Sequence, residues 1–140
     1  MRLPLSFFVP RSAEFVFDCL TNPVQFVAAH PVIYRMDALG DDRYRVFERL
    51  PLGPVTLGFT YEATIKGDAA RRRVAMRARV LAVVTIGMEF QLTPAAGGTL
   101  VQEQVTFTSW LPVGPAMRGI FRKLHTQLFT NIGRAPTGAA

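Results

Sequence analysis

Two glutamates interrupt the apolar faces of predicted strands, and they are the first candidates for chemistry in this chain. Glu103 shares an alternating face with Val105 and Phe107, and Glu48 shares one with Val46. An ionised carboxylate is costly on an apolar face unless it reaches water, finds a partner or stays protonated. Inside a pocket it could anchor a ligand hydroxyl or exchange a proton with it. For Glu48 we favour a strand end that reaches water, or a bulge. For the mid-strand Glu103 both interpretations stay open.

The two histidines are the other acid–base candidates. His30 ends a short predicted helix beside Phe26, where it could titrate or bind a ligand, although capping the helix is the more common role at such a position. His125 flanks the apolar stripe of the last predicted helix, and we expect it at the surface. The catalytic candidates are therefore Glu103 and His30.

The sequence contains no motif for metal, cofactor or nucleophile chemistry. The histidines lack HExxH or comparable spacing, no serine sits in a G-x-S-x-G turn, and no dinucleotide or Walker motif occurs. Cys19 is the only cysteine, which excludes an intramolecular disulfide and a Cys-based zinc site; we place it in the core. We expect no metal and no cofactor.

One long helix and a succession of strands must position these groups. Apolar residues recur at helical spacing in residues 113–132, where Gly114-Pro115 opens the pattern and Gly133 closes it. That stripe consists of Met117, Ile120, Phe121, Leu124, Leu128 and Ile132. Only this side is continuously apolar, so we expect Phe121 and Leu124 to face the sheet and Arg118 and Arg122 to face water.

The rest of the chain predicts a strand at residues 3–9, two short helices, and six strands in hairpin succession up to residue 110. Ser12 is a suitable N-cap for the first helix, and Asn22-Pro23 separates the two helices. The clearest alternation lies at residues 55–65, which Gly67-Asp68 would turn. A loop is predicted at residues 94–98. Hairpin connections imply an antiparallel sheet with one packed face, so the fold class is α+β.

At this point the chain resembles the START/Bet v 1-like helix-grip (SRPBCC) superfamily, and within it the polyketide cyclase/dehydrase and lipid-transport group. Three stretches carry the resemblance: residues 9–23, which read VPRSAEFVFDCLTNP, the hairpin series through Trp110, and the helix after Leu111-Pro112. The resemblance implies a curved antiparallel sheet of about seven strands, wrapped around the C-terminal helix, with an apolar ligand between them. We expect a single domain at residues 1–134 and a flexible tail at 135–140.

The inward faces, together with the resemblance, predict the ligand-binding residues. They are Phe26, Phe59, Tyr61, Met76, Met88, Phe90, Glu103, Phe107, Trp110, Met117, Phe121 and Leu124. Methionine and phenylalanine form adaptable apolar walls. The alternative is that these side chains fill the core and leave no cavity. For Trp110 a clamp at the strand-to-helix corner is a further alternative.

Composition limits location and partners. The 140 residues are 49% hydrophobic with a formal net charge of +6, and Lys66 and Lys123 are the only lysines. We expect the arginines at positions 43, 45, 49, 73, 77 and 79 to coat the convex face of the sheet. Without a nucleic-acid motif we expect no nucleic-acid partner, and peripheral contact with an anionic membrane stays open. No signal peptide or membrane span is recognisable, so we expect a cytoplasmic protein, as a monomer or a homodimer.

Three functions are consistent with this pattern. The first is a carrier or binding protein for a hydrophobic or amphipathic small molecule such as a lipid, a quinone or a polyketide. The second is an enzyme similar to polyketide cyclase/dehydrases, in which a pocket carboxylate or histidine acts as acid or base. The third is an interaction module whose cavity is filled. A buried acid–base pair within about 3 Å favours the enzyme, a featureless cavity favours the carrier, and the absence of a void favours the module.

Overall fold

The computed structural model describes residues 1–80, 82–109 and 114–136. The predicted order of one strand, two helices, six strands and a final helix is confirmed. The elements are β1 (Arg2–Val9), α1 (Ala13–Thr21), α2 (Pro23–Ala29), β2 (Ile33–Gly40), β3 (Arg43–Leu52), β4 (Val55–Asp68), β5 (Arg73–Val80), β6 (Val84–Ala95), β7 (Gly98–Ser109) and α3 (Gly114–Arg134).

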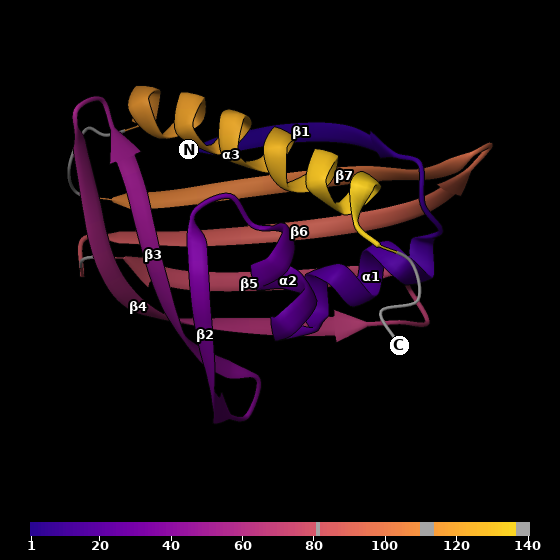
Figure 1. Cartoon of the computed structure of the whole chain (residues 1–140), viewed down its shortest axis with the longest axis horizontal. Coiled ribbons are helices and arrows are strands. Elements are labelled where there is room, and N and C mark those ends of the chain that lie inside the picture. The colour runs from indigo at the N-terminus through magenta and orange to yellow at the C-terminus, as the bar shows by residue number, and fades with distance from the viewer. Residues whose placement is uncertain (81, 110–113, 137–140) are drawn as a thin grey trace.

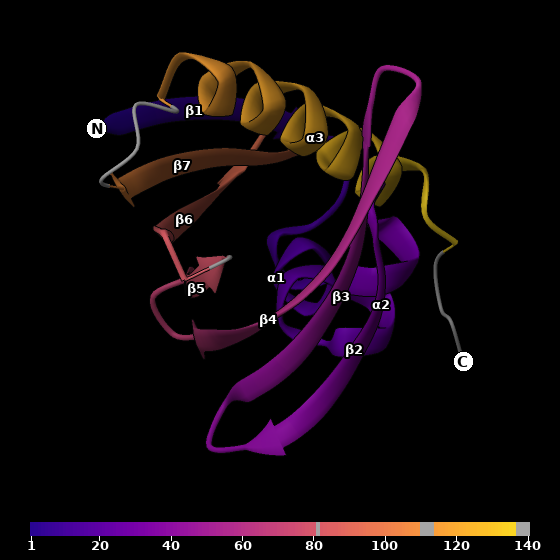
Figure 2. The same cartoon turned by 90° about the vertical axis from the view of Figure 1, so that its left-hand side faces the viewer.

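The seven strands form one antiparallel sheet in the order β1-β7-β6-β5-β4-β3-β2. The sheet is strongly curved: β1 and β2 lie at its two edges, and Figure 2 shows β2 and β3 swung around so that the concave side encloses the helices. The helix α3 runs across the top of this concavity, and α1 and α2 occupy one end of it (Figure 1). This is the helix-grip arrangement that the sequence predicts.

Side-chain caps begin both short helices. The Ser12 hydroxyl oxygen accepts a hydrogen bond from the backbone N–H of Phe15 at 3.1 Å, as the sequence predicts. The Asn22 side chain accepts from the N–H groups of Val24 and Gln25, with Pro23 in the first turn of α2. These caps fix the sharp break between α1 and α2, which brings α2 against the open end of the sheet.

Two glycine positions differ from the sequence predictions. Gly67 does not turn the chain, because β4 continues to Asp68; a Cβ at Gly67 would lie 2.7 Å from Cζ of Phe17, so the glycine lets α1 pack directly on the strand. The loop predicted at residues 94–98 is shorter. β6 extends to Ala95 and β7 begins at Gly98, leaving only Ala96 and Gly97 between them, and the φ of +80° at Gly97 suits glycine.

The helix α3 presents the predicted face. Phe121 packs edge-to-face on Phe107 of β7 with ring centroids 5.1 Å apart, whereas Arg118 and Arg122 are exposed. At the other end of α3, the guanidinium of Arg11 donates to the carbonyl oxygens of Ile132 and Ala135, where a cation complements the helix dipole. The helix is thereby tied to the start of α1.

The predicted surface features follow the same alternation. The six arginines expected on the convex face are all exposed, and Cys19 is 2% exposed within the core. Among the described residues, no helix is long and apolar enough to cross a membrane. Trp110 and Val113 lie outside the described residues, as does most of the predicted tail.

Candidate functional site

A pocket of about 310 Å³ lies beneath α3, between that helix, α2 and the inward faces of β2 to β6. The strands supply alternate residues because a period of two sends every second side chain to the concave face. Most of the predicted ligand-binding residues line this pocket: Phe26, Phe59, Tyr61, Met76, Met88, Phe90, Met117, Phe121 and Leu124.

Three predicted residues are placed differently. Phe107 is buried behind Phe121 and supports the wall without lining it. Glu103 is also set back from the pocket, behind His125. Trp110 is not among the described residues. The pocket also contains residues that sequence reasoning did not assign to it, chiefly His125, Glu48 and Ile33.

The pocket reaches the surface near the hairpin that joins β3 to β4. Leu57 lines the pocket and is 40% exposed, and the neighbouring Val55 and Leu52 are 61% and 44% exposed. Figure 2 shows this hairpin rising past α3. Met117 and Ile120 line the pocket from the N-terminal half of the helix. An apolar rim therefore surrounds the route inward.

A buried polar contact joins Glu103 of β7 to His125 of α3. The Nδ1 atom of His125 lies 2.7 Å from both carboxylate oxygens of Glu103, with hydrogen-bond geometry to Oε1 only. Glu103 is 3% exposed and His125 is 5% exposed. The second oxygen, Oε2, is buried and has no hydrogen-bond partner among the described residues. Because a carboxylate can only accept, Nδ1 carries the proton that joins them.

This contact fixes how the imidazole meets the pocket. Aromatic rings hold the ring of His125: Phe121 is edge-on at 5.1 Å and Phe90 is stacked at 6.4 Å between centroids. With Nδ1 engaged by Glu103, the remaining nitrogen Nε2 has no hydrogen-bond partner among the described residues. The side chain lines the pocket. A carboxylate that orients a histidine in this way makes its other nitrogen available for hydrogen bonding or proton transfer.

A second carboxylate, Glu48, belongs to the pocket wall. Its Oε1 atom accepts a hydrogen bond from the Tyr61 hydroxyl at 2.8 Å, across β3 and β4. Burial raises the pKa of Glu48; the hydrogen bond from Tyr61 and the nearby His125 lower it to a smaller extent. Burial also raises the pKa of Tyr61 well above its ordinary range, and the Glu48 carboxylate raises it further. The tyrosine therefore acts as a neutral donor at neutral pH.

His30 combines the two roles that the sequence left open. It is the C-cap residue of α2, and its side chain lines the pocket. Its Nδ1 atom accepts hydrogen bonds from the N–H groups of Val32 at 3.2 Å and Ile33 at 3.0 Å. Burial, and to a smaller extent the nearby His125, lower the pKa of His30 to about 3. His30 is therefore neutral, with its proton on Nε2.

Two sequence interpretations were wrong. His125 is not at the surface: it is 5% exposed, and on the helix wheel it lies in line with the half-buried Phe121 and the buried Leu128 and Ile132. Glu48 is not at a strand end, because β3 extends to Leu52; its side chain is half-buried and lines the pocket. The bulge that the sequence left open has a counterpart in β2, where the pairing with β3 shifts between Ile33, which is opposite Glu48, and Arg35. The inward position of Glu103 could have identified His125 as a site residue, because a buried carboxylate requires a hydrogen-bond partner and the opposite helix contains a single histidine.

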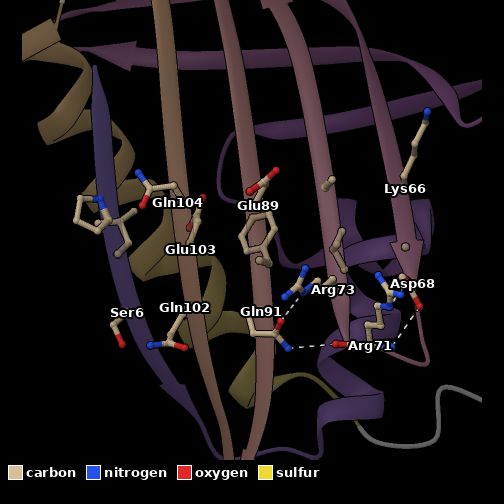
Figure 3. A pocket seen from close by; sticks show the side chains of 16 residues that line it. Ser6, Lys66, Asp68, Arg71, Arg73, Glu89, Gln91, Gln102, Glu103 and Gln104 are labelled. Carbon is tan, nitrogen blue, oxygen red and sulfur yellow. Dashed lines mark hydrogen bonds and ion pairs between the residues drawn. The ribbon is translucent and has the colours of Figure 1, made fainter.

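A larger hollow of about 820 Å³ lies on the opposite, convex face of the sheet, but its chemistry is that of a wetted surface. Figure 3 shows Ser6, Gln91, Gln102 and Gln104 spread over β1, β7 and β6, with the Arg73 guanidinium donating to Gln91 at 2.7 Å. Arg71, Arg73, Gln91 and Asp68 bond to one another or to the backbone at one end of this hollow. Other polar side chains that line it make no hydrogen bond or ion pair among the described residues: Ser6, Lys66, Glu89, Gln102 and Gln104. Among the described residues, no cluster of three or more potential ligands could hold a metal ion on either face.

Comparison with known proteins finds likeness in structure. No protein-family model matches the sequence, and no curated protein matches it. The structure of Ara h 8.0201 is 13% identical with a TM-score of 0.76 over 95% of each chain. A START superfamily protein from Mycobacterium smegmatis is 14% identical, with a TM-score of 0.78 over 94% of each chain. The di-domain ARO/CYC BexL from the BE-7585A biosynthetic pathway is 16% identical with a TM-score of 0.79, over 94% of this chain and 46% of that one.

These likenesses extend over nearly the whole chain and show that it has the Bet v 1-like helix-grip fold, as the sequence predicts. At identities of 13% to 16% they carry the fold and not an activity. What the protein binds or transforms must be argued from the pocket.

Proposed function

We propose that this protein binds a hydrophobic or amphipathic small molecule between the sheet and α3, as a carrier or binding protein. The observation that supports this most directly is the 310 Å³ pocket, whose walls are methionine, phenylalanine and aliphatic side chains. Of the described residues that line it, only His30, Glu48, Tyr61 and His125 have polar side chains. Ligand sites of proteins typically have volumes from about 300 Å³ upward and combine apolar walls with a few polar groups.

Binding would draw its free energy from the apolar surface that the ligand removes from water, at about 25 cal/mol per Å² before ordering costs. Four methionines line the pocket, at positions 36, 76, 88 and 117. Their flexible thioethers can adapt to more than one ligand shape. The exposed apolar rim around Leu57 would be the entry route. A filled interaction module is less well supported, because side chains do not close the space.

An apolar fluorescent probe, N-phenyl-1-naphthylamine, tests the proposal. We expect saturable binding to the parent protein and loss of binding in Ala78→Trp, because Ala78 lines the pocket and is 8% exposed. The matched control is Ala75→Trp, on the other face of the same strand, which should bind the probe as the parent does. Equal binding by both variants, or none by the parent, would contradict the proposal.

A second candidate function is proton transfer by an enzyme of the polyketide cyclase/dehydrase kind. The observation that favours it is the His125 imidazole, which lines the pocket while Glu103 holds its Nδ1 atom at 2.7 Å. In such a reaction Nε2 would remove a proton from a carbon next to a carbonyl group, and the imidazolium formed would be stabilised by Glu103.

Deuterium exchange distinguishes this function from simple binding. A β-keto ester with an alkyl chain is incubated with the protein in heavy water, and loss of its α-proton signal is followed by NMR. The enzyme hypothesis expects exchange faster than in buffer, with the acceleration lost in His125→Asn. Exchange at the buffer rate, with the ester demonstrably bound, would leave the protein a carrier.

A further inference from the structure

The polar groups of the pocket determine which kind of ligand headgroup the pocket accepts. This inference about the headgroup rests on the proposed binding function and extends it. Three polar groups come from three elements: His30 from the end of α2, Glu48 from β3 and His125 from α3, and a hydrogen bond of 2.8 Å from the Asn131 side chain to the Ala29 carbonyl ties α3 to α2 beside His30. All three polar groups line the same pocket. These three side chains form the headgroup site of the pocket.

The two histidines have opposite hydrogen-bonding character. At His30 the Nδ1 atom accepts from two backbone N–H groups, so the proton of the neutral ring is on Nε2, which is a donor. At His125 the Nδ1–H faces Glu103, so Nε2 of the neutral ring is an acceptor. Neither Nε2 atom has a hydrogen-bond partner among the described residues. A ligand thus meets one donor and one acceptor.

Glu48 adds acceptor capacity and no positive charge. Its Oε1 atom is occupied by Tyr61, and Oε2 has no hydrogen-bond partner among the described residues. No lysine or arginine is among the described residues that line the pocket. With a neutral imidazole the Glu103–His125 pair carries one negative charge, and protonation of the imidazole would only cancel that charge. The headgroup site therefore has no net positive charge at neutral pH.

From this we infer that the pocket selects an uncharged alcohol or phenol, whose hydroxyl donates to His125 or Glu48 and accepts from His30, and that it rejects carboxylate and phosphate amphiphiles. A hydroxyl is both donor and acceptor, which matches the pair of Nε2 atoms. An anion would be desolvated beside Glu48 and Glu103 without a counter-charge. An ether or ester of the same length would leave the acceptor on His125 unpaired.

Displacement of N-phenyl-1-naphthylamine by matched ligands tests the inference. We compare 1-decanol with decyl methyl ether in the parent protein and in His125→Asn, whose amide N–H can still donate to Glu103 while no nitrogen replaces Nε2. Because the ratio of the two ligands is compared between proteins, their intrinsic difference in hydrophobicity cancels. We expect the preference for the alcohol to fall about threefold to tenfold in the variant, the range of one hydrogen bond.

A second pair of ligands and a second variant test whether the pocket rejects a negatively charged headgroup. Decanoate is compared with methyl decanoate at pH 7 in the parent and in Glu48→Gln, which keeps the shape and removes the negative charge. We expect decanoate to bind the parent at least tenfold more weakly than the ester, and to gain relative to the ester in the variant. This comparison of decanoate with its methyl ester does not depend on whether His125→Asn folds.

The outcomes separate the two proposals. If the probe binds the parent but alcohol, ether and carboxylate displace it in ratios that neither variant changes, the headgroup inference is overturned and the binding function stands. If decanoate displaces the probe from the parent as well as its methyl ester does, the inference is likewise overturned. If the probe and all the ligands fail to bind the parent, the proposed function itself fails, and this inference fails with it.

Discussion

Two carboxylates extend from the sheet toward the interior, and their surroundings differ. Glu48 lines the pocket, is half-buried and bonds to a phenol that is on the sheet itself. Glu103 is almost completely enclosed and bonds to an imidazole of the helix. The first pair lies within the sheet and stays accessible to a ligand. The second joins the sheet to α3, so it contributes to the fold and orients the histidine that a ligand would meet.

The comparison shows that an inward carboxylate has two possible uses. Near the open side of the pocket, Glu48 can exchange its contacts with a ligand at modest cost. Beneath the helix, a change at Glu103 must disturb the packing of α3 before it reaches the pocket.

Removing the enclosed carboxylate should be the most damaging change. Glu103→Leu leaves His125 buried without its partner, and breaking a buried pair in this way costs about 3–5 kcal/mol of unfolding free energy. Chemical denaturation followed by circular dichroism measures the loss. Glu48→Gln is the matched control and should cost about 1 kcal/mol or less, since its amide can still accept from Tyr61. Similar losses in the two variants would remove the distinction between the pairs.

The next effect is the pH dependence of stability that His30 introduces. The pKa of His30 is about 3 in the folded protein and near the ordinary 6.5 in the unfolded chain. Between these values the unfolded state binds more protons, so stability falls as the pH drops below 6.5, by about 2 kcal/mol at pH 5.

His30→Asn isolates this contribution, because its side-chain oxygen can still accept from the backbone N–H groups of Val32 and Ile33 but cannot titrate. We expect the unfolding free energy of the variant, measured between pH 7 and pH 5, to fall less steeply than that of the parent. A parent and a variant with the same pH slope would show that His30 is not buried in its neutral form.

Loss of the hydrogen bond within the sheet should have a smaller effect. Tyr61→Phe removes the donor to Glu48 and should destabilise the protein by about 1 kcal/mol, and it should also change probe binding because both residues line the pocket. Tyr44→Phe is the control, since the Tyr44 hydroxyl makes no hydrogen bond among the described residues. If both variants leave stability and probe binding unchanged, the hydrogen bond from Tyr61 to Glu48 contributes neither to stability nor to ligand binding.

An ion pair on the convex face should contribute least. Arg43 and Glu62 approach to 3.9 Å with both side chains about half exposed. Replacing Arg43 with Gln should change the unfolding free energy by about 0.5 kcal/mol or less and leave probe binding intact. A larger loss would mean that the outer face contributes more to the fold than its solvent exposure implies.

The fold was largely predictable because its elements are encoded by local periodicity. Alternation at residues 55–65 and 84–92 identified the inward faces, and the helical spacing from Met117 to Ile132 identified the face of α3. Glycine was the exception, since Gly67 resembles a turn residue in sequence and serves here to admit Phe17. A single glycine supports either interpretation until its neighbours in space are known.

The candidate site was less predictable because its contacts cross between distant elements. Alternation placed Tyr61, Met88 and Phe90 on the inward face of the sheet, and the family resemblance was needed to assign them to a pocket. The pairing of Glu103 with His125 depends on the angle at which α3 crosses β7, which no local pattern encodes. The aromatic surroundings of His125, Phe90 and Phe121 likewise come from two elements.

Methyl NMR of the methionines is the most direct test of the claim that a small molecule occupies the space between sheet and helix. The chain has five methionines: four line the pocket, and Met1, 48% exposed, lies outside it. With ¹³C-methyl methionine and increasing 1-decanol, the account predicts shifts and ligand contacts at Met36, Met76, Met88 and Met117, with Met1 unchanged. Resonances that do not respond, or a response confined to Met1, would contradict it.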